Sequence, residues 1–151
     1  MKNILYIIVS ILMITAGSAF AESSTAVVSV SATVLPIAEL TVLHQETWLT
    51  LTTEDIQNGF VDVRQAVIIS VKTNSENGYL LSFYAESSQL NAISVISGSN
   101  TYNISGTGGE VHMPYEGPDH VIKRLGFRFD LSEDSVPGTY QWPVDMMISS
   151  M

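Results

Sequence analysis

Apolar and polar residues alternate along most of this chain, and that two-residue period limits what it can fold into. A β-strand turns successive side chains to opposite faces, so an alternating segment buries one face and exposes the other. Residues 125–131 and 139–148 show the alternation clearly, and residues 66–71 form a nearly continuous apolar run. Because no helical stripe extends beyond a turn or two, the sequence predicts an all-β fold.

The expected strands are short and are separated by Gly, Pro and Asn turns, a spacing that favours a β-sandwich, with a small β-barrel as the alternative. They cover residues 26–35, 37–43, 48–51, 60–63, 66–71, 79–85, 90–96, 101–104, 111–113, 121–131 and 139–148. Two local features are expected as well. Thr53 is predicted to cap a single helical turn, and Asn77-Gly78 is predicted to close a hairpin over residues 71–85.

The first 21 residues have the order of a secretory signal peptide. Lys2 precedes an apolar run too short to span a bilayer, and Ala19-Phe20-Ala21 follows it. Cleavage is expected after Ala21, an uncleaved membrane anchor being the alternative. We therefore expect residues 1–21 to be a signal peptide, residues 22–35 an N-terminal extension, and residues 36–151 one β-sandwich domain. The product is expected to be exported, with no membrane insertion after cleavage.

Charge and cysteine content exclude several classes of function. The chain has 15 acidic residues against six lysines and arginines, a net charge of −9. Such a surface repels the phosphates of nucleic acids and anionic lipids, so no nucleic-acid partner is expected. The chain has no cysteine, which excludes disulfides, thiol catalysis and zinc sites built on Cys. Stability must come from sheet pairing, apolar packing or a partner chain.

No catalytic, cofactor or metal site is expected, and the protein is not expected to be an enzyme. The three histidines lie in no recognisable catalytic motif, although a triad is assembled in space and sequence leaves one open. Glu110 and His112 would share a strand face, with Asp119 and His120 a few residues later. These side chains could bind a divalent metal, but exposed polar residues are the favoured interpretation.

The segment at the start of the exported chain is the most suggestive feature. Val28, Val30, Ala32 and Val34 fall on one face of an alternating stretch that Pro36 separates from the next strand. This stretch could be the first strand of the domain's own sandwich. It could equally be a donor strand that pairs with an open sheet edge of a neighbouring copy, its alternate side chains filling that copy's core.

Taken together, these residues resemble a bacterial fimbrial (pilin) subunit of the chaperone–usher type. The likeness rests on the leader, the alternating opening over residues 26–34, the Asn77-Gly78 turn and the Pro137-Gly138-Thr139-Tyr140 sequence before the last strand. It implies an immunoglobulin-like sandwich that lacks one strand. A periplasmic chaperone would complete that sandwich first, and the next subunit's extension would then replace the chaperone. An outer-membrane usher is implied as a further partner. The chain departs from the commonest pattern because it has no Cys pair.

The expected function is that of an exported structural subunit of a surface fibre or envelope assembly, joined by β-strand complementation. Val28, Val30, Ala32 and Val34 would then be the residues of the subunit interface. The protein would pass through the periplasm to the cell surface, with subunits of the same fibre as partners. The alternative is a free-standing periplasmic or secreted binding module for carbohydrate, which would display a cluster of exposed aromatic side chains.

Overall fold

The computed structural model describes residues 29–151, of which residues 34–151 form one compact unit. The expected leader, its cleavage site and Val28 lie outside the described residues. Residues 29–37 have no helix or strand assignment, so the strand predicted over residues 26–35 is not formed in the described part of that range. An alternating pattern shows which side chains could share a face, but a strand also needs a hydrogen-bonded neighbour.

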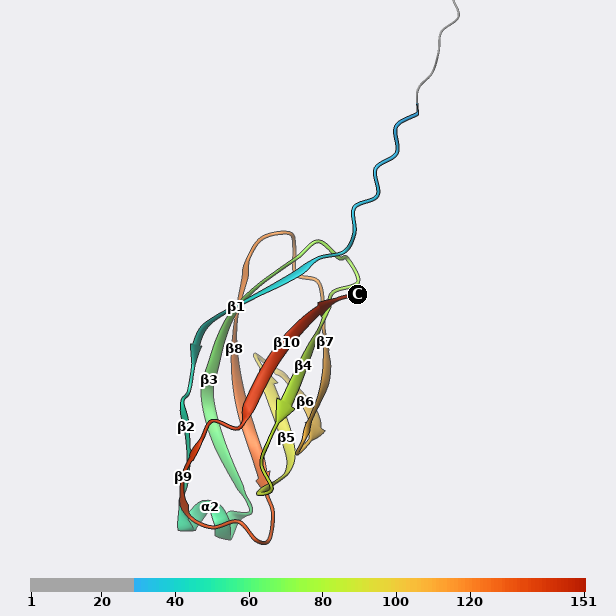
Figure 1. Ribbon diagram of the computed structural model, residues 1–151. Helices are drawn as coiled ribbons and strands as arrows, with labels where there is room; N and C mark the ends of the chain where they lie inside the picture. Colours follow the sequence, from blue (N-terminus) through green and yellow to red (C-terminus); the bar gives the residue numbers. More distant parts are fainter. Residues whose placement is uncertain (1–28) are drawn as a thin grey trace, which may run out of the picture. The chain divides into compact units, whose positions relative to one another are not determined.

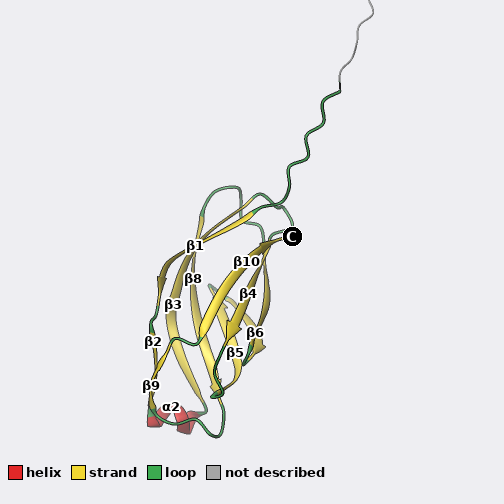
Figure 2. Ribbon diagram, viewed as in Figure 1, coloured by secondary structure: helices red, strands yellow, loops and turns green. Residues whose placement is uncertain are grey.

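The described chain folds into strands and one short helix (Figures 1 and 2). In chain order these are β1 (Ala38–Gln45), β2 (Trp48–Leu51), α2 (Thr53–Asn58), β3 (Phe60–Thr73), β4 (Tyr79–Ala85), β5 (Leu90–Ser97), β6 (Asn100–Ser105), β7 (Gly108–Met113), β8 (Val121–Leu131), β9 (Gly138–Gln141) and β10 (Val144–Ser150). Between Ser29 and Met151, no helix has the length and apolar character needed to cross a bilayer.

Eight strands form one sheet in the order β1-β3-β8-β5-β6-β7-β4-β10, and all its pairs are antiparallel. The two remaining strands, β2 and β9, pair with each other. The sheet curls until its end strands, β1 and β10, lie beside each other (Figure 1), so the domain is a nearly closed, barrel-like sandwich. The predicted all-β fold is confirmed, and the near closure also agrees with the barrel alternative.

The core consists of the inward side chains of the sheet. In β8, Leu125, Phe127 and Phe129 are buried, and Arg124 and Arg128 in the alternate row are exposed, as the alternation predicts. Phe127 and Phe129 stack with their ring centroids 5.8 Å apart, and the Trp142 ring meets both edge-on at 5.5 Å. Buried apolar and aromatic area is the main favourable term in folding, and here it stands in for disulfides.

Two predicted strand boundaries are wrong. In one case two predicted strands form a single strand, and in the other one predicted strand is divided into two. Residues 60–63 and 66–71 belong to one strand, β3, which has a bulge between Val63 and Val67 where it pairs with β8. Conversely, residues 139–148 are divided at Trp142 and Pro143 into β9 and β10, which pair with β2 and β4. Proline has no N–H to donate, and the division lets the two halves join different neighbours.

The predicted hairpin over residues 71–85 is also wrong. β3 pairs with β1 and β8, and β4 pairs with β7 and β10, so the two strands are not neighbours in the sheet. Asn77-Gly78 does lie in a turn, with Gly78 at a positive φ of 86° and its N–H bonded to the Ser75 carbonyl at 3.0 Å. The loop therefore connects two strands, β3 and β4, that lie at separate places in the sheet.

The helical turn forms, but its cap is one residue earlier than predicted. Thr52, not Thr53, is the N-cap of α2, and its Oγ1 accepts a hydrogen bond from the Asp55 N–H at 3.2 Å. The Asp55 carboxylate accepts one in return from the Thr52 N–H at 2.8 Å. This reciprocal capping box requires an acceptor three residues after the cap, and Thr52 with Asp55 provides that spacing.

Candidate functional site

The eight-stranded sheet has two edge strands, β1 and β10, whereas a fully closed barrel has none. Among the described residues, β1 forms its ladder with β3 and β10 forms its ladder with β4, and neither has a ladder on its other side. One edge of each strand therefore presents backbone N–H and C=O groups that no sheet neighbour satisfies. Such edges are templates for pairing with another strand.

The two edges are joined at one end of the domain. There the β2–β9 ladder joins the first and last parts of the domain, and the Trp142 N–H donates to the Thr47 carbonyl at 2.8 Å. At the start of β10, the Gln45 Nε2 donates to the Val144 carbonyl at 3.4 Å. From that point β1 and β10 continue to their free ends without a ladder between them (Figure 1).

The inner face of β1 is incompletely covered along this edge. Leu40 lies opposite Val71 and Val42 lies opposite Ile69, and cross-strand partners share a face. Val71 and Ile69 are buried, yet Leu40 is half-buried and Val42 is 46% exposed. The inward side chains are therefore less buried on β1 than on β3.

The inner face of β10 shows the same loss of cover. Met146 lies opposite Phe83, and Ile148 lies opposite Leu81. Both partners on β4 are fully buried, whereas Met146 and Ile148 are half-buried. Val144, at the end where the two edges are joined, is buried. Apolar area thus remains in contact with water on the inner faces of both strands that lack a neighbour.

A short loop after β3 ties these free ends together. Asn74 donates from Nδ2 to the Leu35 carbonyl at 3.0 Å, and its Oδ1 accepts from the Ile37 N–H at 2.6 Å. Ser75 Oγ donates to the Met151 carbonyl at 2.7 Å. This loop fixes where the chain enters β1 and where it leaves β10. The sequence predicts only a hairpin turn here, because bonds to Leu35 and Met151 join parts of the chain that are far apart in the sequence.

The predicted donor residues that the structure describes are exposed. Val30 and Val34 are 88% and 77% exposed, and Ala32 between them is exposed as well. Val28 lies outside the described residues. None of the three belongs to a strand, so in this structure they fill no core position of the sheet.

The side chains considered for metal binding or catalysis have other contacts. Glu110 Oε1 accepts from Ser82 Oγ at 3.2 Å, and His112 Nε2 lies 2.9 Å from the Asn77 carbonyl. Within residues 29–151, no three His, Asp or Glu side chains gather as a metal site would require. His120 Nδ1 lies 3.3 Å from Ser70 Oγ, but no carboxylate of the described chain contacts this imidazole as in a triad.

The aromatic side chains divide between the core and the surface. Tyr79 and Trp142 are buried, whereas Trp48 and Tyr84 are 60% and 53% exposed. Trp48 is on β2 and Tyr84 is on β4, two strands that do not pair with each other. The two exposed aromatic side chains therefore lie on strands that are not neighbours in a sheet.

The unpaired edges of β1 and β10, and the incomplete burial of their inward side chains, are thus the observations that bear on function. Comparison of the chain with protein-family models, with curated proteins and with solved structures found no match. The resemblance to fimbrial subunits consequently stays a prediction from sequence.

Proposed function

We propose that this chain is an exported structural subunit of a bacterial surface fibre or envelope assembly, and that its copies are joined by β-strand complementation. The observation that carries the proposal is the pair of unpaired edges, β1 and β10, whose inner rows are incompletely buried. A strand added between them would satisfy both rows of backbone groups. It would also cover Leu40, Val42, Met146 and Ile148.

The extension of a second copy suits this position. Val30, Ala32 and Val34 are exposed and recur at every second residue, which is the spacing that places side chains on one face of a strand. Small and β-branched side chains can enter a core between two strands that already approach each other. Val28 would continue the same row. An apolar row of this kind is costly to leave in water, and burial in a neighbour removes that cost.

The first experiment deletes residues 22–34 from the exported protein. The intact protein is expected to form oligomers on size-exclusion chromatography, and the deleted protein is expected to run as a monomer. A synthetic peptide of residues 22–36 should bind the deleted protein and raise its melting temperature, because it binds the folded state and not the unfolded one. Unchanged assembly of the deleted protein would refute strand complementation.

A pair of point variants tests the predicted face of the donor strand. Val30→Asp places a charge in the row that would be buried, and Ser31→Asp places the same charge in the opposite row. Burying an unpaired carboxylate is far more costly than leaving it in water. Val30→Asp is therefore expected to abolish assembly, and Ser31→Asp to leave it intact. Equal behaviour of the two variants would show that the segment does not insert as an alternating strand.

A further inference from the structure

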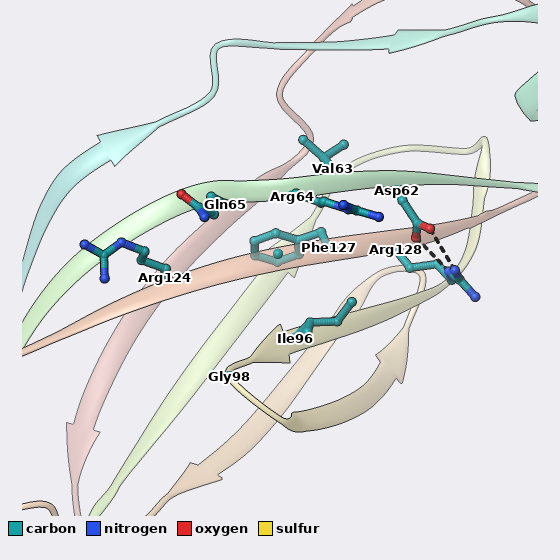
Figure 3. Close-up of a pocket in the computed structure, with 10 residues that line it drawn as sticks. Asp62, Val63, Arg64, Gln65, Ile96, Gly98, Arg124, Phe127 and Arg128 are labelled. Carbon is teal, nitrogen blue, oxygen red and sulfur yellow. Dashed lines mark hydrogen bonds and ion pairs between the residues drawn. The ribbon is translucent and has the colours of Figure 1, made fainter.

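A second feature lies on the outer face of the sheet, away from β1 and β10. A pocket of about 490 Å³ opens where β3, β8 and β5 run side by side, and no residue of the two end strands lines it (Figure 3). Its lining includes Asp62, Arg64 and Gln65 from β3 and Arg124 and Arg128 from β8. The inference drawn from this pocket does not depend on strand complementation.

The pocket exists because a glycine occupies an outward position of β8. Gly126 lies between Arg124 and Arg128 in the outward row and pairs with Ile96 of β5. A Cβ at Gly126 would meet the Val63 carbonyl oxygen at 3.5 Å, an ordinary contact distance. A side chain could therefore be accommodated there, and its absence leaves a hollow floored by backbone.

The wall on the β3 side is a strained bulge. Gln65 has a φ of 52°, the only positive φ of a non-glycine residue in the described chain. The left-handed conformation costs an L-residue about 1–2 kcal/mol, and such strain persists where the surrounding structure holds it, often at binding sites. The bulge brings Arg64 and Gln65 to consecutive positions on the pocket wall.

Positive charge is concentrated here in a strongly acidic protein. Three of the chain's six lysines and arginines line the pocket, namely Arg64, Arg124 and Arg128. Arg128 is neutralised by Asp62, to which its Nε and one terminal nitrogen donate at 2.7 Å each, and it lies 4.2 Å over the Phe60 ring. Hydrogen bonding by Arg128 also keeps the pKa of Asp62 below its usual value.

The other two arginines have no such partner. Within residues 29–151, neither Arg64 nor Arg124 is in an ion pair. Figure 3 shows Arg124 at one end of the pocket and Arg64 directed toward the Asp62–Arg128 pair at the other. With Arg128 neutralised, the pocket retains two positive charges, which favours an anionic ligand in spite of the protein's net negative charge.

Arg124 also lines a neighbouring pocket of about 460 Å³, and Gly98 is shared by the two. This second pocket is built around the β5–β6 turn and presents the hydroxyl and amide groups of Ser97, Ser99, Asn100 and Tyr102. Its far wall includes Lys123, which is ion-paired with Glu116. A cationic hollow thus adjoins one that offers neutral hydrogen-bonding groups.

We propose that these two pockets together bind an acidic saccharide of one or two sugar units. A guanidinium group binds a carboxylate through two parallel hydrogen bonds, and Arg124 lies where the pockets meet. Arg64 adds positive charge at the opposite end of the first pocket. Serine hydroxyls and the Asn100 amide can donate to and accept from sugar hydroxyls. The carboxylate of the sugar lies at Arg124, and its hydroxyl groups face the β5–β6 turn.

The test is calorimetric titration of the exported protein with three probes. These are a glucuronic acid–glucose disaccharide, the matched neutral glucose disaccharide, and inorganic phosphate. The acidic disaccharide is expected to bind, more weakly as salt is raised, and the neutral one to bind at least about tenfold more weakly, as expected when a charge-assisted hydrogen-bond pair is lost. Equal binding of phosphate and the acidic disaccharide would overturn the assignment to saccharides, and no binding of either would overturn the site.

Variants then locate the binding. Arg124→Gln is expected to lower the affinity about tenfold, whereas Lys72→Gln, the same change of charge on an exposed part of β3 outside both pockets, should leave it unchanged. Gly126→Leu should fill the first pocket and abolish binding. Circular dichroism of Arg124→Gln and Lys72→Gln establishes that both remain folded. Equal affinities of these two variants would contradict the proposed position of the carboxylate.

Discussion

At the scale of single residues, the buried polar atoms are the most informative about stability. Tyr79 is buried at the start of β4, and its hydroxyl has no hydrogen-bond partner among the described residues. Burial raises the pKa of this phenol above its usual value, and the nearby Glu116 carboxylate raises it further. A buried hydroxyl without a partner contributes desolvation cost without the compensating bond.

Tyr79→Phe is therefore expected to leave the free energy of unfolding unchanged or to raise it slightly at pH 7. The pH dependence has a definite sign. In the unfolded chain a tyrosine loses its proton near pH 10, whereas folded Tyr79 keeps its proton, so the wild type loses stability as pH rises above about 10. The variant lacks this loss, and its advantage should grow above pH 10. Urea denaturation at pH 7 and pH 10.5 measures both effects, and a clear destabilisation at pH 7 would show that the hydroxyl is hydrogen-bonded.

At the scale of elements, the local sequence largely determines where a strand begins and ends, whereas contacts with distant segments determine which strands pair. The strands at residues 48–51 and 121–131 have the bounds predicted from the sequence, and in each one face is more buried than the other. The same reasoning failed at Asn77-Gly78, where the turn is real but the strands it joins have other partners. Sheet order depends on contacts between distant parts of the chain, which a local pattern does not contain.

The helix cap provides a test at this scale with a matched control. Thr52→Ala removes the oxygen that accepts from the Asp55 N–H and is expected to lower the free energy of unfolding by about 1 kcal/mol. Thr53→Ala, the adjacent exposed threonine, should change it by less than about 0.5 kcal/mol. Chemical denaturation of both variants gives the comparison. A larger loss for Thr53→Ala would mean that the sequence-based assignment of the cap was right after all.

At the scale of the whole domain, the sequence could predict the class of fold but not which strands would end the sheet. The apolar content of residues 37–43 and 139–148 suggests two ordinary core strands. Their half-buried inner rows follow from their places at the ends of the sheet, since an end strand has a neighbour on one side only. The proposed donor half of the candidate site is recognisable in the sequence as an alternating extension. The proposed receiving half depends on which strands end the sheet, and only the strand pairing shows that.

The unpaired edges make a prediction about the exchange of backbone amides in the assembled protein. Amides on the open sides of β1 and β10 should exchange with solvent quickly in the protein lacking residues 22–34, because no ladder protects them. Amides of β3 and β8, which have neighbours on both sides, should already be slow. In the assembled protein the end strands should become as slow as β3 and β8, since an added strand provides the missing acceptors. Hydrogen exchange followed by mass spectrometry measures both states. Slowing confined to β6 and β7, with β1 and β10 unchanged, would mean that copies associate through a different surface.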